Sequence, residues 1–201
     1  MTSALLLSGG MDSISLAWKL RPEFAITIDY GQLPAQAEIQ AADAVCTRLD
    51  IRHEVIRVNC RKLGMGDMSG LASCELAPAS DWWPFRNQLL VTLAGMRCIA
   101  LGVKCLYLGT VKSDEQHRDG TPEFIRSVSH LMSYQEGSLQ VESPAISMSS
   151  AELVRWSGIP SSLLAWAHSC HTSNVACGQC RGCNKYFATF SELGYDLECA
   201  S

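Results

Sequence analysis

The chain has 201 residues, which suits one domain with room for a small additional segment. Hydrophobic residues make up 47% and charged residues 18% of the chain, a balance that supports a core and argues against disorder. The formal net charge is −4, so no general basic field favours nucleic acid as a partner.

No apolar run approaches the roughly 18 residues that a membrane-spanning helix needs. The N-terminus leads directly into a predicted strand, without the basic and apolar regions of a signal peptide. We therefore expect a cytoplasmic protein that does not engage a membrane.

Short apolar runs alternate with helical patterns along the chain. In order, the patterns predict a strand at 4–7, a helix at 13–20, a strand at 24–28, a helix at 34–49, a strand at 53–58, a helix at 85–101, a strand at 104–108, a helix from Pro122, a strand at 144–148 and a helix from the Ser149/Ser150 cap to Trp156. This alternation predicts an α/β fold: a doubly wound, mainly parallel five-stranded sheet with helices on both faces and ligands at the carboxyl ends of the strands.

The composition divides the chain into two parts. Residues 1–160 carry the alternating pattern and are expected to form the α/β domain. Within them, the glycine- and serine-rich stretch 61–80 shows no period and is expected to be a loop or lid. Residues 161–201 are expected to form a small zinc-binding segment packed on this domain.

The first predicted strand runs into the sequence SGGMDS. Backbone N–H groups at the start of a helix bind phosphate, and a carboxylate beside them can hold a metal ion. The motif lacks the Gly-Lys-Ser/Thr ending of a Walker A loop, and an ordinary capped strand-to-helix turn is the alternative. The candidate ligands are Ser8, Gly9, Gly10, Asp12 and Ser13.

SGGMDS resembles the pyrophosphate loop of the N-type ATP pyrophosphatases. The resemblance implies that the chain binds ATP with Mg²⁺, cleaves it between the α and β phosphates, and adenylates an oxygen of its substrate. The loop would then hold the released pyrophosphate.

Four of the ten cysteines crowd into one short stretch with the spacing C-x6-C-x2-C-x2-C: Cys170, Cys177, Cys180 and Cys183. Two overlapping C-x2-C steps suit tetrahedral Zn²⁺, and four thiolates make a closed, structural site. An iron–sulfur cluster and a sulfur-carrying redox pair are the alternatives.

The loop and the cysteines, with four motifs between them, resemble the QueC family of 7-cyano-7-deazaguanine synthases over nearly the whole chain. DYGQ at 29–32 matches a family motif, PFRN at 84–87 resembles its P-G-R-N, Gly109 with Asp114 fits its G-x4-D, and EF at 123–124 fits the E-F that follows.

The resemblance implies roles for individual residues. Asp29, Tyr30, Gln32 and Gly109 would join the loop in binding the nucleotide, and Asp12 and Asp114 would hold Mg²⁺. Arg86 would steady phosphate or carboxylate, and Asn87 and Asp119 would bind the substrate.

In the implied reaction, the carboxylate of 7-carboxy-7-deazaguanine attacks the α-phosphate of ATP to give an acyl adenylate and pyrophosphate. Ammonia then gives an amide, and a second activation gives the nitrile. The family resemblance also suggests a homodimer.

The chain departs from the family pattern in loops that face substrate or phosphate. Its HRDGTP at 117–122 stands in place of Y-P-D-C-R, so the tyrosine, cysteine and arginine are lost while Asp119 remains. SSAE at 149–152 replaces S/T-K-x-E, with Ser150 at the position of the lysine. Lys112, Arg118 and Arg155 are cations that can compensate for the missing lysine. Lys112 is therefore counted among the catalytic candidates, with Asp12, Arg86 and Asp114.

These departures suggest a divergent paralogue, of the kind found in bacterial antiviral defence systems, that joins the deazaguanine to a protein amine. Two further hypotheses are a tRNA sulfur transferase built on the same loop and a catalytically degraded module that binds a partner through its zinc knuckle. The net charge disfavours the sulfur transferase, and the retained SGGMDS and Asp114 disfavour the degraded module.

Overall fold

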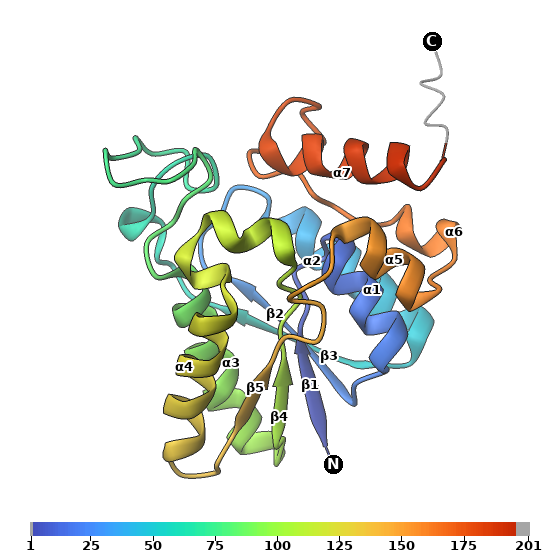
Figure 1. Ribbon diagram of the computed structural model, residues 1–201. Helices are drawn as coiled ribbons and strands as arrows, with labels where there is room; N and C mark the ends of the chain where they lie inside the picture. The colour runs from blue at the N-terminus through green and yellow to red at the C-terminus, as the bar shows by residue number, and fades with distance from the viewer. Residues whose placement is uncertain (1, 196–201) are drawn as a thin grey trace.

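Five parallel strands form the centre of the molecule in this computed structural model, which describes residues 2–195 (Figure 1). The strands are β1 (Ser3–Leu6), β2 (Phe24–Asp29), β3 (Arg52–Arg57), β4 (Cys105–Tyr107) and β5 (Gln140–Glu142). Their order in the sheet is β3-β2-β1-β4-β5, and each neighbouring pair is parallel. Residues 196–201 of the expected C-terminal segment lie outside the described residues.

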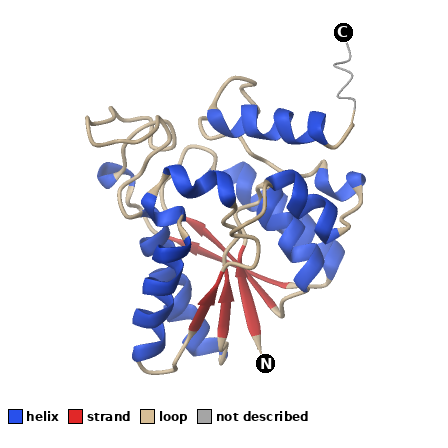
Figure 2. Cartoon of the chain, viewed as in Figure 1, coloured by secondary structure: helices blue, strands red, loops and turns tan. Residues whose placement is uncertain are grey.

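Helices cover both faces of the sheet, as Figure 2 shows. They are α1 (Met11–Leu20), α2 (Ala35–Leu49), α3 (Arg86–Leu101), α4 (Pro122–Tyr134), α5 (Ser150–Ser157), α6 (Ser161–Leu164) and α7 (Arg181–Glu192), with 3-10 helices η1 (Arg61–Leu63), η2 (Lys112–Gln116) and η3 (Arg118–Gly120). One core cluster joins the sheet to α1, α2 and α5, and a second joins it to α3 and α4. The doubly wound α/β fold predicted from the alternating pattern is therefore confirmed.

The predicted helix starts have clear local causes. The Ser149 hydroxyl accepts a hydrogen bond from Glu152 N at 3.1 Å, and Glu152 accepts one from Ser149 N at 2.7 Å, so a capping box begins α5. Thr121 caps α4, with Pro122 in the first turn.

The prediction of a fifth strand at 144–148 is wrong. Pro144 has no N–H to donate to a ladder, and Ile146 N and Met148 N instead donate to the carbonyls of Ser143 and Ala145 within a turn. The strand lies earlier, at Gln140–Glu142, where only Val141 is buried, so the segment is too short for its period to be recognised. The loop at the carboxyl end of this strand therefore begins at Ser143.

The strand order reverses between β1 and β4, which lie side by side at the centre of the sheet. The loops that leave two such strands diverge and open a crevice at their carboxyl ends. Helix α7 lies across this end of the sheet (Figure 1). Its Phe190 joins the core cluster of α1 and α5, so the C-terminal segment is packed on the α/β domain. Among the described residues, no helix is long and apolar enough to cross a membrane.

Candidate active site

A cavity of about 460 Å³ lies at the carboxyl ends of β1, β2 and β4. Its walls come from the SGGMDS loop, the loop after β4, the start of α3, the 3-10 turns η2 and η3, and the cysteine-rich segment. This is the edge of the sheet where a ligand of a doubly wound fold binds.

The SGGMDS loop lies on the floor of this cavity. Ser8, Gly10, Asp12 and Ser13 line it, and Gly10 is the N-cap of α1. The Ser13 hydroxyl donates to Gly10 O at 2.9 Å, which holds the turn. Gly9 has φ +75°, and a Cβ there would lie 2.4 Å from Glu38 O, so this position needs glycine to pack against α2.

The loop after β4 packs directly on the start of α1. A Cβ on Gly109 would lie 3.2 Å from Ser13 Cα, so glycine allows the close approach of the two floor loops. Gly109 lines the cavity beside the SGGMDS loop.

Asp12 and Asp114 come together across the cavity, with a lysine between them. Lys185 Nζ lies 2.9 Å from Asp12 Oδ2 and 3.1 Å from Asp114 Oδ1. Burial lowers the pKa of Lys185, but the two carboxylates raise it well above its usual range, so the ammonium stays charged. Asp12 Oδ1 is buried, and no described residue donates a hydrogen bond to it.

The lysine found at this site is not the one that the sequence analysis expected. Lys112 is exposed on η2, and the described cavity lining does not include it. Ser150, at the position of the family lysine, is buried in α5. Lys185 is the lysine that lines the cavity, and sequence reasoning missed it. Its position two residues after Cys183, on the helix that follows the cysteines, was the available signal.

The DYGQ motif separates into one cavity residue and two supporting residues. Tyr30 lines the cavity and packs edge-on against Trp83, with ring centroids 4.8 Å apart. Gln32 accepts from Tyr30 N and donates to Glu38 Oε2 at 2.7 Å, so it holds this corner together. Asp29 Oδ1 accepts from Gly31 N within the turn. Neither Asp29 nor Gln32 is part of the described lining.

Glu38 is a buried carboxyl in the cavity wall that the sequence analysis did not single out as a site residue. Burial raises its pKa to about 7, although the Gln32 hydrogen bond and the Arg86 charge work in the opposite direction.

Arg86, Asn87 and Asp119 lie together on another wall of the cavity. Asn87 N donates to Asp119 Oδ2 at 3.0 Å, and Asn87 Nδ2 donates to Asp119 O at 2.8 Å, so η3 is fixed to the start of α3. Burial lowers the pKa of Arg86, but the charges of Tyr30 and Asp119 raise it by more, so the pKa lies above its usual value. The guanidinium is therefore a fixed cation facing the cavity.

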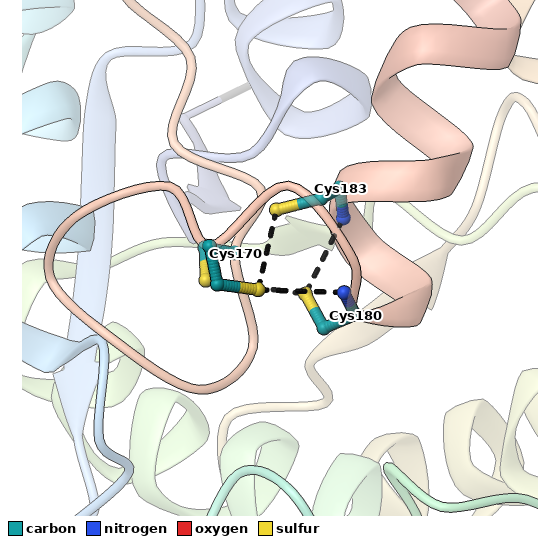
Figure 3. Close-up of side chains that lie close together, drawn as sticks. Cys170, Cys180 and Cys183 are labelled. Atoms are coloured by element: carbon teal, nitrogen blue, oxygen red, sulfur yellow. Dashed lines mark hydrogen bonds between the residues drawn. The ribbon is translucent and has the colours of Figure 1, made fainter.

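The four cysteines form a cluster that can hold one metal ion. Their sulfurs all lie within 4.8 Å of one another, and the Cys177–Cys183 and Cys170–Cys180 pairs are each 3.9 Å apart. Figure 3 shows Cys170, Cys180 and Cys183 turned toward each other. Cys180 Sγ accepts hydrogen bonds from His171 N and Cys183 N, contacts that stabilise a thiolate. The sulfur–sulfur spacing matches a tetrahedron with metal–sulfur bonds of about 2.3 Å.

Comparison with known proteins identifies the family. The model of the family described as "Queuosine biosynthesis protein QueC" matches residues 2–194. The chain belongs to the QueC family. A 7-cyano-7-deazaguanine synthase of Desulforudis audaxviator is 32% identical over 210 residues, which cover 92% of this chain and 94% of that protein. A 7-cyano-7-deazaguanine synthase of Chlorobaculum tepidum is 27% identical and covers 98% of this chain and 94% of its own length.

A solved structure shares the fold. The U34-tRNA thiolase NcsA from Methanococcus maripaludis, solved with its [4Fe-4S] cluster, superposes with a TM-score of 0.56 at 14% identity. The match covers 98% of this chain and 66% of that chain, so this chain spans less than two thirds of the thiolase. At this identity the likeness concerns the fold alone.

One departure from the QueC pattern, the HRDGTP segment, contributes to a charged cluster in the cavity wall. His117, the first residue of HRDGTP, has Nε2 3.3 Å from Asp81 Oδ1. His171 Nδ1 lies 3.4 Å from Asp81 Oδ2, and Arg181 Nε lies 3.2 Å from Asp81 Oδ1. Burial raises the pKa of Asp81, but His117, His171 and Arg181 hold it well below its usual range. Sequence reasoning did not assign Asp81, His171 or Arg181 to this cluster, because no local motif connects them.

Proposed function

We propose that this chain is an ATP-dependent ligase that adenylates the carboxylate of 7-carboxy-7-deazaguanine, or of a close analogue, and transfers the acyl group to an amine. Pyrophosphate and AMP are the other products. The observation that carries the proposal is the shared cavity in which the SGGMDS loop, Asp12, Asp114 and Arg86 meet. Membership of the QueC family supports the substrate class.

The cavity supplies what phosphoryl chemistry needs. N–H groups at the start of α1 can bind the leaving pyrophosphate, and Arg86 can neutralise the carboxylate or the α-phosphate. Lys185 adds a third positive group beside Asp12 and Asp114. Such a site can bring two anionic reactants together and lower their repulsion.

Asp12 and Asp114 fit a hard cation. The buried Asp12 Oδ1 lacks a described hydrogen-bond donor, and carboxylate oxygen is a preferred ligand of Mg²⁺. We propose that these two residues hold Mg²⁺, which would supply further charge neutralisation for ATP.

We also propose zinc for the four cysteines. A four-thiolate tetrahedron fits the compact sulfur arrangement, whereas an iron–sulfur cluster places iron and sulfide between the thiolates and needs them farther apart. The purified protein should contain about one Zn²⁺ per chain and lack the visible absorbance of an iron–sulfur cluster.

The acceptor amine is either ammonia, which leads to amide and nitrile, or a protein amine, as in a defence paralogue, which stops at the amide. The replaced Y-P-D-C-R and S/T-K-x-E segments favour the protein amine. A homodimer remains part of this proposal, and the mass of the purified protein in solution tests it.

Incubation with ATP, Mg²⁺ and 7-carboxy-7-deazaguanine is expected to yield AMP and pyrophosphate. Asp12→Ala should abolish both, whereas Asp43→Ala, on the exposed side of α2, should leave them unchanged. Mass spectrometry separates nitrile, amide and protein adduct. No AMP with any 7-deazaguanine acid would overturn the ligase, and a product that carries sulfur would favour the sulfur transferase.

A further inference from the structure

Asp81 joins three segments that are far apart in the sequence. It comes from the stretch between η1 and α3, His117 from the turn between η2 and η3, and His171 and Arg181 from the cysteine-rich segment. All four residues line the cavity, and the Asp81 side chain is 8% exposed.

His117 is the member of this cluster whose two ring nitrogens are both buried without a hydrogen-bond partner among the described residues; Asp81 Oδ1 and His171 Nδ1 are the other such atoms in it. His117 is 7% exposed, and its Nε2 faces Asp81 at 3.3 Å. Neither ring nitrogen makes a hydrogen bond within residues 2–195. A buried imidazole without partners is costly unless a ligand completes it.

The coupling step of the proposed function needs a proton acceptor. At neutral pH, ammonia and primary amines are mostly protonated, and the amine must lose protons as its nitrogen bonds to the acyl carbon. A histidine held by a carboxylate on one ring nitrogen is suited to accept a proton on the other.

We propose that His117, positioned by Asp81, accepts the proton of the amine that attacks the acyl adenylate. The inference rests on the proposed function and specifies its second half-reaction. The N–C bond forms, the C–O bond to AMP breaks, AMP leaves with the electron pair, and the proton passes to Nδ1 of His117. The imidazolium then forms an ion pair with Asp81.

Most other titratable side chains of the cavity wall have polar partners of their own. Asp12 and Asp114 hold Lys185, and Asp119 accepts from Asn87. His168 Nε2 lies 2.9 Å from Ser173 O. Glu38 is bonded to Gln32, and His171 adjoins the metal ligand Cys170.

The charges that face His117 come from the segments packed around it. The Asp81 carboxylate faces its ring, and Arg181 and His171 lie against the same carboxylate.

The decisive experiment separates the two half-reactions in the full-length protein. Exchange of pyrophosphate into ATP, with 7-carboxy-7-deazaguanine but no amine, reports adenylation. Amide formation with ammonia, compared with hydroxylamine, reports coupling. Hydroxylamine is largely unprotonated at neutral pH and depends little on a protein base.

His117→Gln is expected to retain exchange within about threefold and to lose about 10²-fold or more of the coupling rate with ammonia. Coupling with hydroxylamine should be nearly restored, and the acid limb that the wild type shows at a constant concentration of unprotonated ammonia should disappear. His130→Gln, at an exposed position on α4, is the matched control and should change neither reaction.

The inference would be overturned if His117→Gln and wild type coupled equally fast, or if the variant lost equal activity with ammonia and with hydroxylamine. Pyrophosphate exchange in the wild type would still uphold adenylation in that case. Absence of exchange in the wild type overturns the proposed function and the inference together. If His117→Gln fails to fold, His117→Asn and the wild-type pH profile carry the same test.

Discussion

The cavity has a floor of backbone groups and a roof of paired charges. The floor consists of residues 8–13 and 108–110, where glycines bring two loops into contact and short-range hydrogen bonds fix them. The roof consists of residues 61–85, 111–121 and 168–185, where ion pairs join segments far apart in the chain. The floor is therefore set by the fold itself, whereas the roof depends on the charge of its members.

The cysteine-rich segment is the part of the roof that also reaches the floor. His168 N donates to Gly9 O at 2.9 Å, and Asn174 Oδ1 accepts from Ala37 N at 2.9 Å in the first turn of α2. Lys185 adds its ion pairs to Asp12 and Asp114. A metal ion that orders this segment would therefore also order the floor of the cavity.

Among the residues of the roof, removing Lys185 should have the largest effect on activity. Lys185→Ala leaves Asp12 and Asp114 without the cation between them, and we expect pyrophosphate exchange to slow by about 10²- to 10³-fold. Lys104→Ala, at the opposite end of the sheet, is the control. If Lys112→Ala slowed exchange more than Lys185→Ala does, Lys112 would be the lysine that supports the reaction. Faster exchange in Lys185→Ala would mean that Lys185 competes with Mg²⁺.

Asp81→Asn should destabilise the roof while sparing the floor. Removing the carboxylate from a buried charged cluster leaves Arg181 and the histidines without their partner, which costs about 3 kcal/mol in the free energy of unfolding. Urea unfolding near pH 7 measures this, with the exposed Asp43→Asn as control.

The pH dependence of this loss has a definite sign. The folded-state pKa of Asp81 is depressed, so its contribution is present above the ordinary aspartate pKa of about 3.9 and is lost as the pH falls. The difference between wild type and Asp81→Asn should therefore shrink below about pH 4. A difference that grows in acid would contradict the assigned ion pairs.

The floor and the scaffold could be predicted because their causes are local. The turn of SGGMDS is visible in six consecutive residues, the cysteines show their spacing, and the two partners of the capping box, Ser149 and Glu152, are three positions apart. Lys185 and Asp81 act on partners far away in the chain, and nothing near them in the sequence names those partners. The prediction of the fifth strand was wrong for another reason: a strand of three residues with one buried side chain is too short to show an alternating hydrophobic pattern.

Glu38→Gln should show the opposite pH dependence at the base of the cavity. Burial raises the folded-state pKa of Glu38 from 4.5 to about 7, so folding favours the protonated form, and its stabilisation is lost as the pH rises through this range. Well above pH 7 the glutamine variant should be more stable than wild type by about 3 kcal/mol, the free energy that corresponds to this change of pKa. Near pH 4.5 the two should unfold alike. Thermal unfolding across this range measures it, with the exposed Glu115→Gln as control, and an advantage confined to acid would refute the assignment.

The smallest effect is expected at the start of α5, where the scaffold stands apart from both floor and roof. Ser149→Ala removes one half of the capping box and should cost about 1 kcal/mol in urea unfolding, whereas the exposed Ser147→Ala should cost little. Because the cap is local and lies outside the cavity lining, pyrophosphate exchange at saturating ATP should be unchanged. A fall in exchange together with this modest loss of stability would show that α5, which carries Ser150, transmits its position to the phosphate site. In that case the scaffold at α5 and the roof of the cavity would not be independent of each other.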